Sequence, residues 1–136
     1  MRINKMSNKY INLYMGDVTE GGSDGIPIST DNTETSPLEI TLDAANNESK
    51  TVKVAVRCEP GFITTGNTVI TFVGSNSNKW VISASENSSF ESSLIIRDSI
   101  NETNKILYIK ALSTADEDPV IDSSTNIRIT TKIKAV

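Results

Sequence analysis

Apolar and polar residues alternate along two segments between residues 37 and 61, and this alternation is the clearest pattern in the chain. The apolar positions recur at every second residue, at Leu38, Ile40 and Leu42 in the first segment and at Val52, Val54, Val56 and Cys58 in the second. A period of two with one apolar side is typical of an antiparallel strand with one buried face. Residues 44–49, AANNES, favour a turn because Asn tolerates left-handed backbone conformations. We therefore expect a β-hairpin here.

Further strand patterns follow at residues 62–74, 80–84, 90–97, 105–112 and 126–136, with turn-forming residues between them. The first of these is apolar on both sides, with Val69 and Val73 on one and Ile70 and Phe72 on the other. It is therefore either covered on both sides or in contact with a neighbouring subunit. Short strands with regular turns predict an all-β fold, an immunoglobulin-like antiparallel β-sandwich of about seven strands over residues 37–136. A closed barrel is the alternative.

A short apolar cluster lies near the N-terminus, at Tyr10, Ile11, Leu13, Tyr14 and Met15. Chain termini fray unless something holds them, so these side chains imply a surface on which they pack. Two alternatives remain open, an edge strand of the sandwich or an arm that leaves the domain and packs on a neighbour. The next residues, 17–36, are polar and contain glycine-rich turn signals, which is typical of a long loop.

We therefore divide the chain into an extended N-terminal arm and loop, residues 1–36, and the β-sandwich, residues 37–136. The five apolar residues of the arm are the predicted partner-binding residues. The first 16 residues carry no apolar run typical of a secretory signal. No segment approaches the roughly 18 apolar residues that a membrane-spanning helix needs, so we expect no membrane partner.

Composition argues against several kinds of chemistry. The chain has no His, the commonest general base and a frequent zinc ligand, and its single Cys58 excludes an intramolecular disulfide. Cys58 occupies an inward strand position, so we expect a buried side chain and not a reactive thiol. The net charge is −4, and Lys and Arg occur singly, so nucleic acid is not an expected partner. Ser, Thr and Asn provide 45 of the 136 residues, which favours strands and turns over helices.

The densest set of potential oxygen ligands is an acidic segment with Asp116, Glu117, Asp118 and Asp122. Calcium takes about six to eight oxygens, but the spacing matches no EF-hand, and a solvated loop is the simpler interpretation. We predict no metal and no cofactor. A glycosidase needs two carboxylates at a fixed separation in a pocket, and nothing in the sequence directs Glu39, Glu59 or Glu86 towards one another. We therefore predict that the chain is not an enzyme.

Glycan binding is an alternative that the aromatic residues leave open, because exposed rings serve as stacking platforms for sugars. Phe62, Trp80 and Phe90 have the phase of core residues. The remaining candidates are Tyr10, Tyr14 and Tyr108. Scattered tyrosines are more often packing residues, so this interpretation ranks second.

Four segments resemble a known family, LEITLDAANNESKTVKVAVRCEPGF, GNTVITFVG, NKWVIS and TNKILYIKA. They are similar to small immunoglobulin-like accessory proteins encoded among the structural genes of tailed phages and prophages of Gram-positive bacteria. The resemblance spans residues 10–136, mainly 38–74 and 80–111, and is strongest at the turns 46–49 and 66–68. NKWVIS is also similar to bacterial immunoglobulin-like modules attached to surface and carbohydrate-active enzymes.

This resemblance implies a non-enzymatic structural protein of a phage or phage-like particle, made in the bacterial host cytoplasm and localised to the virion. We expect a capsid decoration protein that docks on the major capsid protein through the N-terminal arm, with a tail or neck position as the second choice. Self-association of the chain as an oligomer is a further expectation. The alternative function is a glycan-binding immunoglobulin-like module for cell-surface attachment.

Overall fold

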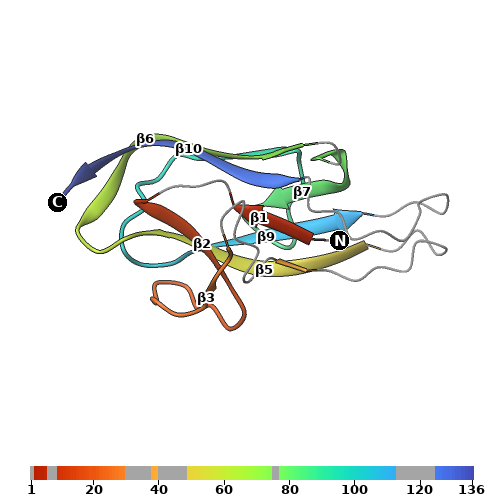
Figure 1. Ribbon diagram of the computed structural model, residues 1–136, viewed down its shortest axis with the longest axis horizontal. Coiled ribbons are helices and arrows are strands. Elements are labelled where there is room, and N and C mark those ends of the chain that lie inside the picture. Colours follow the sequence, from red (N-terminus) through yellow and green to blue (C-terminus); the bar gives the residue numbers. More distant parts are fainter. Residues whose placement is uncertain (1, 6–8, 30–37, 40–48, 75–76, 113–124) are drawn as a thin grey trace.

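A computed structural model describes residues 2–5, 9–29, 38–39, 49–74, 77–112 and 125–136. Ten strands and one short 3-10 helix lie in these ranges (Figure 1), namely β1 (Arg2–Lys5), β2 (Ile11–Met15), β3 (Ile26–Pro27), β4 (Leu38–Glu39), β5 (Ser49–Cys58), β6 (Phe62–Val73), η2 (Ser77–Lys79), β7 (Trp80–Ser83), β8 (Ser93–Ile96), β9 (Lys105–Leu112) and β10 (Asn126–Ala135). The fold is all-β, as predicted.

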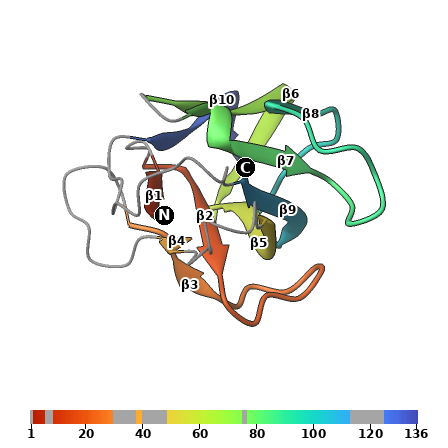
Figure 2. The same cartoon turned by 90° about the vertical axis from the view of Figure 1, so that its right-hand side faces the viewer.

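The strands form two five-stranded sheets. The first sheet has the order β4-β1-β10-β6-β8 and the second sheet the order β3-β2-β5-β9-β7. Seen end-on, β6, β8 and β10 form one layer and β2, β5 and β9 the other (Figure 2). This arrangement confirms the β-sandwich over the closed barrel. All pairings are antiparallel except that of β1 with β10, which is parallel.

The core lies between the two sheets and follows the predicted alternation. Leu107, Ile109 and Ala111 of β9 are fully buried, as are Val54 and Val56 of β5. Trp80 is also buried and stacks on Phe72, with 6.2 Å between ring centroids. Of the other predicted core rings, Phe62 packs at the edge of the core, whereas Phe90 is half-buried beneath the Lys110 ammonium. The core prediction for Phe90 is therefore wrong.

The predicted hairpin between residues 38 and 58 does not form. Leu38 pairs with Ile3 in the first sheet, whereas β5 lies in the second sheet between β2 and β9. The two segments do have strand patterns, but period alone does not say which strands are neighbours. Residues 40–48, which include the predicted turn, lie outside the described residues.

The N-terminal segment belongs to the sandwich. β1 lies between β4 and β10 in the first sheet, and β2 pairs with β5 in the second, with Ile11 opposite Cys58 and Leu13 opposite Val56. Of the two alternatives for the apolar cluster, the strand is therefore correct and the extended arm is wrong. The predicted boundary at residue 36 does not separate residues 2–5 and 11–15 from the fold.

Candidate functional site

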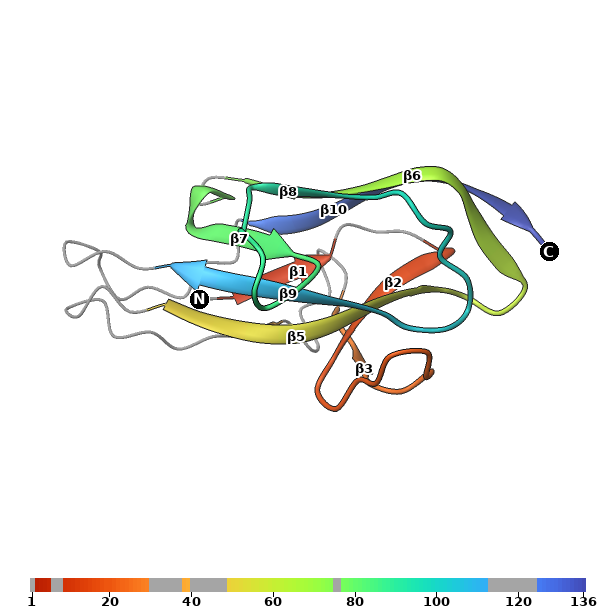
Figure 3. The ribbon, with the colours of Figure 1, turned by 180° about the vertical axis from the view of Figure 1, so that it is seen from behind.

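The outer face of the second sheet carries a covering loop, residues 16–25, which joins β2 to β3. In Figures 1 and 3 this loop lies on the side of the second sheet that faces away from β6, β8 and β10. Val18 of the loop is buried against Tyr14 and Ala55, with Ile106 packed alongside. These apolar contacts form a second, smaller cluster outside the main core and hold the loop on the sheet.

A polar cluster, here called the clasp, completes this attachment and consists of Thr19, Asp24, Arg57 and Asn104. The Asn104 Nδ2 group donates to the Thr19 carbonyl at 2.9 Å and to Asp24 Oδ1 at 2.7 Å. Asn104 Oδ1 accepts from Arg57 Nη1 at 2.8 Å, and the same nitrogen donates to the Asp24 carbonyl at 2.7 Å. Because Asn104 is only 3 % exposed, these bonds satisfy a side chain that burial would otherwise penalise.

Electrostatics within and beside the clasp follow from these bonds. Asp24 accepts hydrogen bonds from the Thr19 backbone N–H and from Thr19 Oγ1, and these bonds hold the pKa of its carboxyl below the ordinary value. The Arg57 guanidinium lies 3.5 Å from the centre of the Tyr14 ring. Burial raises the pKa of Tyr14, and the positive charge of Arg57 opposes that rise.

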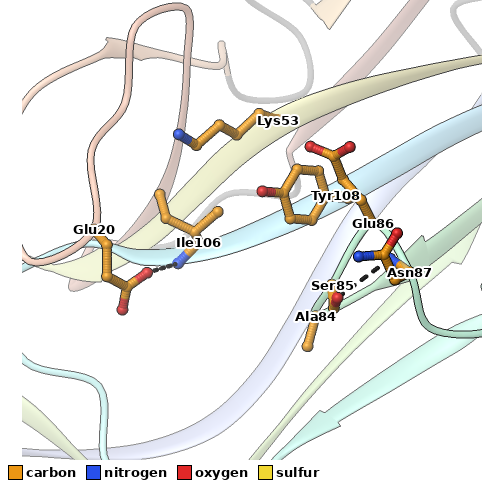
Figure 4. Close-up of a pocket in the computed structure, with 8 residues that line it drawn as sticks. All are labelled: Glu20, Lys53, Ala84, Ser85, Glu86, Asn87, Ile106 and Tyr108. Carbon is orange, nitrogen blue, oxygen red and sulfur yellow. Dashed lines mark hydrogen bonds between the residues drawn. The ribbon is translucent and has the colours of Figure 1, made fainter.

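A pocket of about 500 Å³ opens beside the covering loop on the same face of the second sheet. Its lining, drawn in Figure 4, consists of Glu20, Lys53, Ala84, Ser85, Glu86, Asn87, Ile106 and Tyr108. Strand register fixes the residues at the centre of the pocket. Tyr108 of β9 lies opposite Lys53 of β5 on one side and opposite Ser83 of β7 on the other. The Glu20 carboxylate accepts from the Ile106 backbone N–H at 3.2 Å, which fixes the loop side of the pocket.

The turn after β7 forms the opposite wall of this pocket. Ser83 Oγ donates to the Ser85 carbonyl at 2.8 Å, and Ser85 Oγ accepts from the Asn87 N–H at 3.2 Å. These local bonds are typical of Ser-containing turns. In Figure 4 they leave the Glu86 and Asn87 side chains beside the Tyr108 ring. The pocket thus combines an aromatic ring, an ammonium, carboxylates and an amide, which together suit a hydroxyl-rich ligand.

The predicted partner-binding residues are mostly occupied within the chain. Ile11 and Leu13 are fully buried in the core, Met15 packs against it, and Tyr14 is 6 % exposed beneath Arg57. Only Tyr10 is exposed, at 45 %, and its ring contacts that of Phe62. The prediction of a docking arm is therefore wrong for Ile11, Leu13, Tyr14 and Met15, whose apolar surface packs within the chain. Tyr10 as a partner-binding residue stays a prediction.

The other candidate residues lie in different parts of the molecule. Of the three predicted sugar-stacking tyrosines, only Tyr108 lines the pocket beside the covering loop. Glu86 lines the same pocket, whereas Glu59 lines another with Tyr14 and Arg57 and accepts from Asn12 Nδ2 at 2.7 Å. The acidic residues 116–118 and 122 lie outside the described residues, and within the described ones no cluster of metal-ligating side chains is found. Cys58 is buried, and burial raises the pKa of its thiol.

Sequence reasoning did not identify Glu20, Lys53 and Asn87 as pocket residues. Lys53 carried a usable signal, because it lies between half-buried Val52 and buried Val54 and must therefore face outwards. Its proximity to Tyr108 depends on the register of β5 and β9, which no local pattern specifies.

The outer face of the first sheet is the second candidate surface, and Figures 1 and 3 show no described segment over it. We call it the bare face. Its outward-facing residues are Ile63, Thr65, Val69, Thr71 and Val73 from β6, Ser93 and Ile95 from β8, and Arg128, Thr130, Lys132 and Lys134 from β10. Ile95 is 49 % exposed, and Val69 and Val73 are half-buried. The sequence left two alternatives for residues 62–74, cover on both sides or contact with a neighbouring subunit. No described segment covers the outer side of this strand, so the first alternative is not met within the described residues.

Comparison with protein-family models, curated proteins and solved structures gave no match. Within the described ranges, no helix is long and apolar enough to cross a membrane. The fold and the two candidate surfaces define the class as a β-sandwich with one covered and one bare outer face.

Proposed function

We propose that this chain is a non-enzymatic structural protein of a phage or phage-like particle, and most specifically a capsid decoration protein that docks on the major capsid protein. A tail or neck position is the second choice. The observation that supports the proposal is the bare face, a three-stranded surface with apolar and threonine side chains at its centre. It takes the docking role that β2, being part of the core, cannot fill.

Physical considerations favour this role for the bare face. Antiparallel sheets commonly leave one face exposed to water, but the residues on that exposed face are normally polar. Here Val69 and Ile95, which are directly paired, place aliphatic side chains side by side at the centre. Burying apolar surface contributes about 25 cal/mol per Å². A particle also presents many copies of its shell protein, so modest affinity per site suffices, particularly if this chain is itself oligomeric.

Particle incorporation tests the proposal. The wild-type chain and a Val69→Ser/Ile95→Ser variant are produced with the particle, and the copies per purified particle are compared. We expect the wild type to co-purify and the variant to be depleted. Ile26→Ser is the matched control, because Ile26 is 57 % exposed on β3, far from β6 and β8 in strand order. Particles without the wild-type chain would refute the function. Equal incorporation of the double variant, with unchanged melting temperature, would refute the docking face.

The second candidate function is a glycan-binding module for cell-surface attachment, which the pocket around Tyr108 favours. Its ring would support the apolar face of a sugar, and Lys53, Glu86 and Asn87 would bond the hydroxyls. A glycan array with wild type, Tyr108→Ala and Tyr10→Ala tests this candidate. We expect binding to be lost only on Tyr108→Ala. Binding that survives this substitution, or a wild type that binds no glycan, would remove the candidate.

A further inference from the structure

We propose that the partner surface facing the bare face is an acidic protein surface with an apolar centre, and that ion pairs with β10 make the attachment salt-dependent. This inference rests on the proposed docking function and names the chemistry of the partner. Its starting observation is a charge asymmetry. β6, β8 and β10 together contain three charged residues, all of them basic, in a chain whose net charge is −4.

The three cations share one side of β10. Arg128, Lys132 and Lys134 are exposed, whereas Ile127 is fully buried and Ile129 and Ile133 are half-buried. Residues two apart on a strand lie roughly 7 Å apart, so Lys132 and Lys134 are neighbours and Arg128 lies about 13 Å from Lys132. The register shifts between Thr130 and Lys132, where β6 has residues 66–68 opposite the single Thr131 of β10. Thr131 is half-buried there, and its hydroxyl bonds that of Thr68 at 2.9 Å. The result is a basic line along one flank of the bare face.

These cations have no partner within the described part of the chain, in contrast to three cations of the second sheet. On β5 and β9, Arg57 bonds Asp24 and Asn104, Lys105 pairs with Asp98 at 3.0 Å, and Lys110 lies 4.2 Å from the centre of the Phe90 ring. No hydrogen bond or ion pair connects the side chains of Arg128, Lys132 or Lys134 to another described residue. Among the described residues, Arg57, Lys105 and Lys110 of the second sheet thus have partners within the chain, whereas Arg128, Lys132 and Lys134 of β10 remain available.

The apolar centre of the bare face favours an acidic protein over other anionic partners. Register places Thr130, Val69 and Ile95 in one row across β10, β6 and β8, and Lys134 beside Ile63. Nucleic acids and anionic polysaccharides offer charge but little aliphatic surface to match these residues, and an apolar patch with a charged border is typical of a protein interface. A second copy of the bare face is disfavoured as the partner, because two basic lines would face each other and repel.

Salt dependence is the expected signature of this contact. Charges at the border of an interface act mainly on the association rate and its dependence on ionic strength. Screening is substantial over about 8 to 10 Å at physiological salt, so exposed cations on β10 lose much of their effect as salt rises. The apolar centre should retain residual binding, because burial of Val69 and Ile95 is not screened.

The experiment uses purified particles that lack this chain and adds purified variants back at about 50 and 200 mM salt. The test variant is Lys132→Glu/Lys134→Glu. The matched control is Lys9→Glu/Lys50→Glu, which makes the same charge change at exposed positions outside both the bare face and the pocket around Tyr108. We expect wild-type affinity to fall about tenfold or more with salt. We expect the test variant to lose about tenfold or more at low salt, and the control to stay within about twofold. Unchanged melting temperatures confirm that each variant is folded.

Three results would overturn the inference, and they are distinguishable. A wild type that does not bind the particles refutes the proposed function and the inference with it. A wild type that binds with no salt dependence, or a test variant that binds equally well, refutes only the acidic partner. Short double-stranded DNA and poly-L-glutamate serve as further probes. If either binds as tightly as the particle, and Ile95→Ser leaves particle binding unchanged, the face recognises polyanions in general.

Discussion

The two sheets of this sandwich are built from similar strands, yet their outer faces differ completely. The second sheet covers its outer face around Tyr14 and Ala55 with residues 16–25 and joins that loop to Asn104 and Arg57 through partly buried hydrogen bonds. The first sheet leaves Val69 and Ile95 in contact with solvent and three cations unpaired within the described chain. The covered face therefore contains interactions that stabilise the fold, whereas the exposed residues of the bare face contribute little to its stability. This contrast predicts that substitutions on the covered face reduce stability, whereas those on the bare face reduce binding.

The largest effect should come from Asn104→Ala, at the centre of the clasp. This change removes three side-chain hydrogen bonds. The Thr19 carbonyl keeps its bond from the Gly22 N–H, and Arg57 Nη1 keeps its bond to the Asp24 carbonyl, but each loses its Asn104 partner. We expect a loss of about 3 kcal/mol in the free energy of unfolding, measured by urea denaturation. Asn101→Ala is the control, because Asn101 bonds Thr103 at an exposed site, and it should cost about 1 kcal/mol or less. Equal effects of the two changes would show that the clasp has no special role.

A somewhat smaller effect is expected for Gly25→Ala in the covering loop. Gly25 has φ of +106°, and an added Cβ would lie 2.5 Å from Val18 Cγ1 and 2.9 Å from Tyr14 Cβ. The loop would have to move off the sheet, at a cost of about 2 kcal/mol. Gly21→Ala is a matched control with φ of +75° and open space around the new methyl, and should cost about 1 kcal/mol. Thermal melts compare the two, and a Gly25→Ala protein as stable as Gly21→Ala would contradict the close packing.

Acid should weaken the covered face through Asp24. Its pKa in the folded state is lower than its ordinary value of 3.8, so ionised Asp24 favours the folded protein. This contribution is complete above the ordinary pKa and is lost as pH falls through the lower folded value. We therefore expect Asp24→Asn to lower the melting temperature near neutral pH, and the difference from wild type to shrink as the pH falls below 3.8. A difference that is constant down to the most acidic folded conditions would contradict this role.

The smallest effect on stability is expected for Ile95→Ser on the bare face. Ile95 is 49 % exposed on β8, so its substitution should change the free energy of unfolding by about 0.5 kcal/mol or less. The same variant should bind particles less well. A large loss of stability would place Ile95 among the residues that hold the sandwich together, and would remove the contrast between the two faces.

Strand identity was predictable from the sequence wherever a segment had several apolar residues in phase. β9 is the clearest case, because Leu107, Ile109 and Ala111 alternate with Ile106, Tyr108 and Lys110. β1 carried almost no signal, since four residues with one central Ile3 have no measurable period. Its position depends on parallel pairing with β10, more than 120 residues away. Strand neighbours of this kind are set by the whole fold and not by local sequence.

The candidate sites were less predictable for the same reason. Asn104 is one of 13 asparagines, and nothing around it in the sequence marks it as the buried one. The bare face could be derived in part, because the apolar residues on both sides of 62–74 indicated a second contact surface. The cluster from Tyr10 to Met15 misled the search for a docking element because apolar residues near a terminus serve equally well in a core strand.

The parallel pairing of β1 with β10 has a consequence for how the protein is made. β10 lies between β1 and β6, so the first sheet consists of separate pieces until residues 126–135 are available. A chain emerging from the ribosome can pair β5 with β9 before β10 is made, but β1 has no neighbour on the side of β6 until residues 126–135 have been made. Contacts between distant parts of a chain also form slowly. Pulse-labelled chains truncated before residue 126 should therefore remain sensitive to protease, and the whole first sheet should become resistant in one late step.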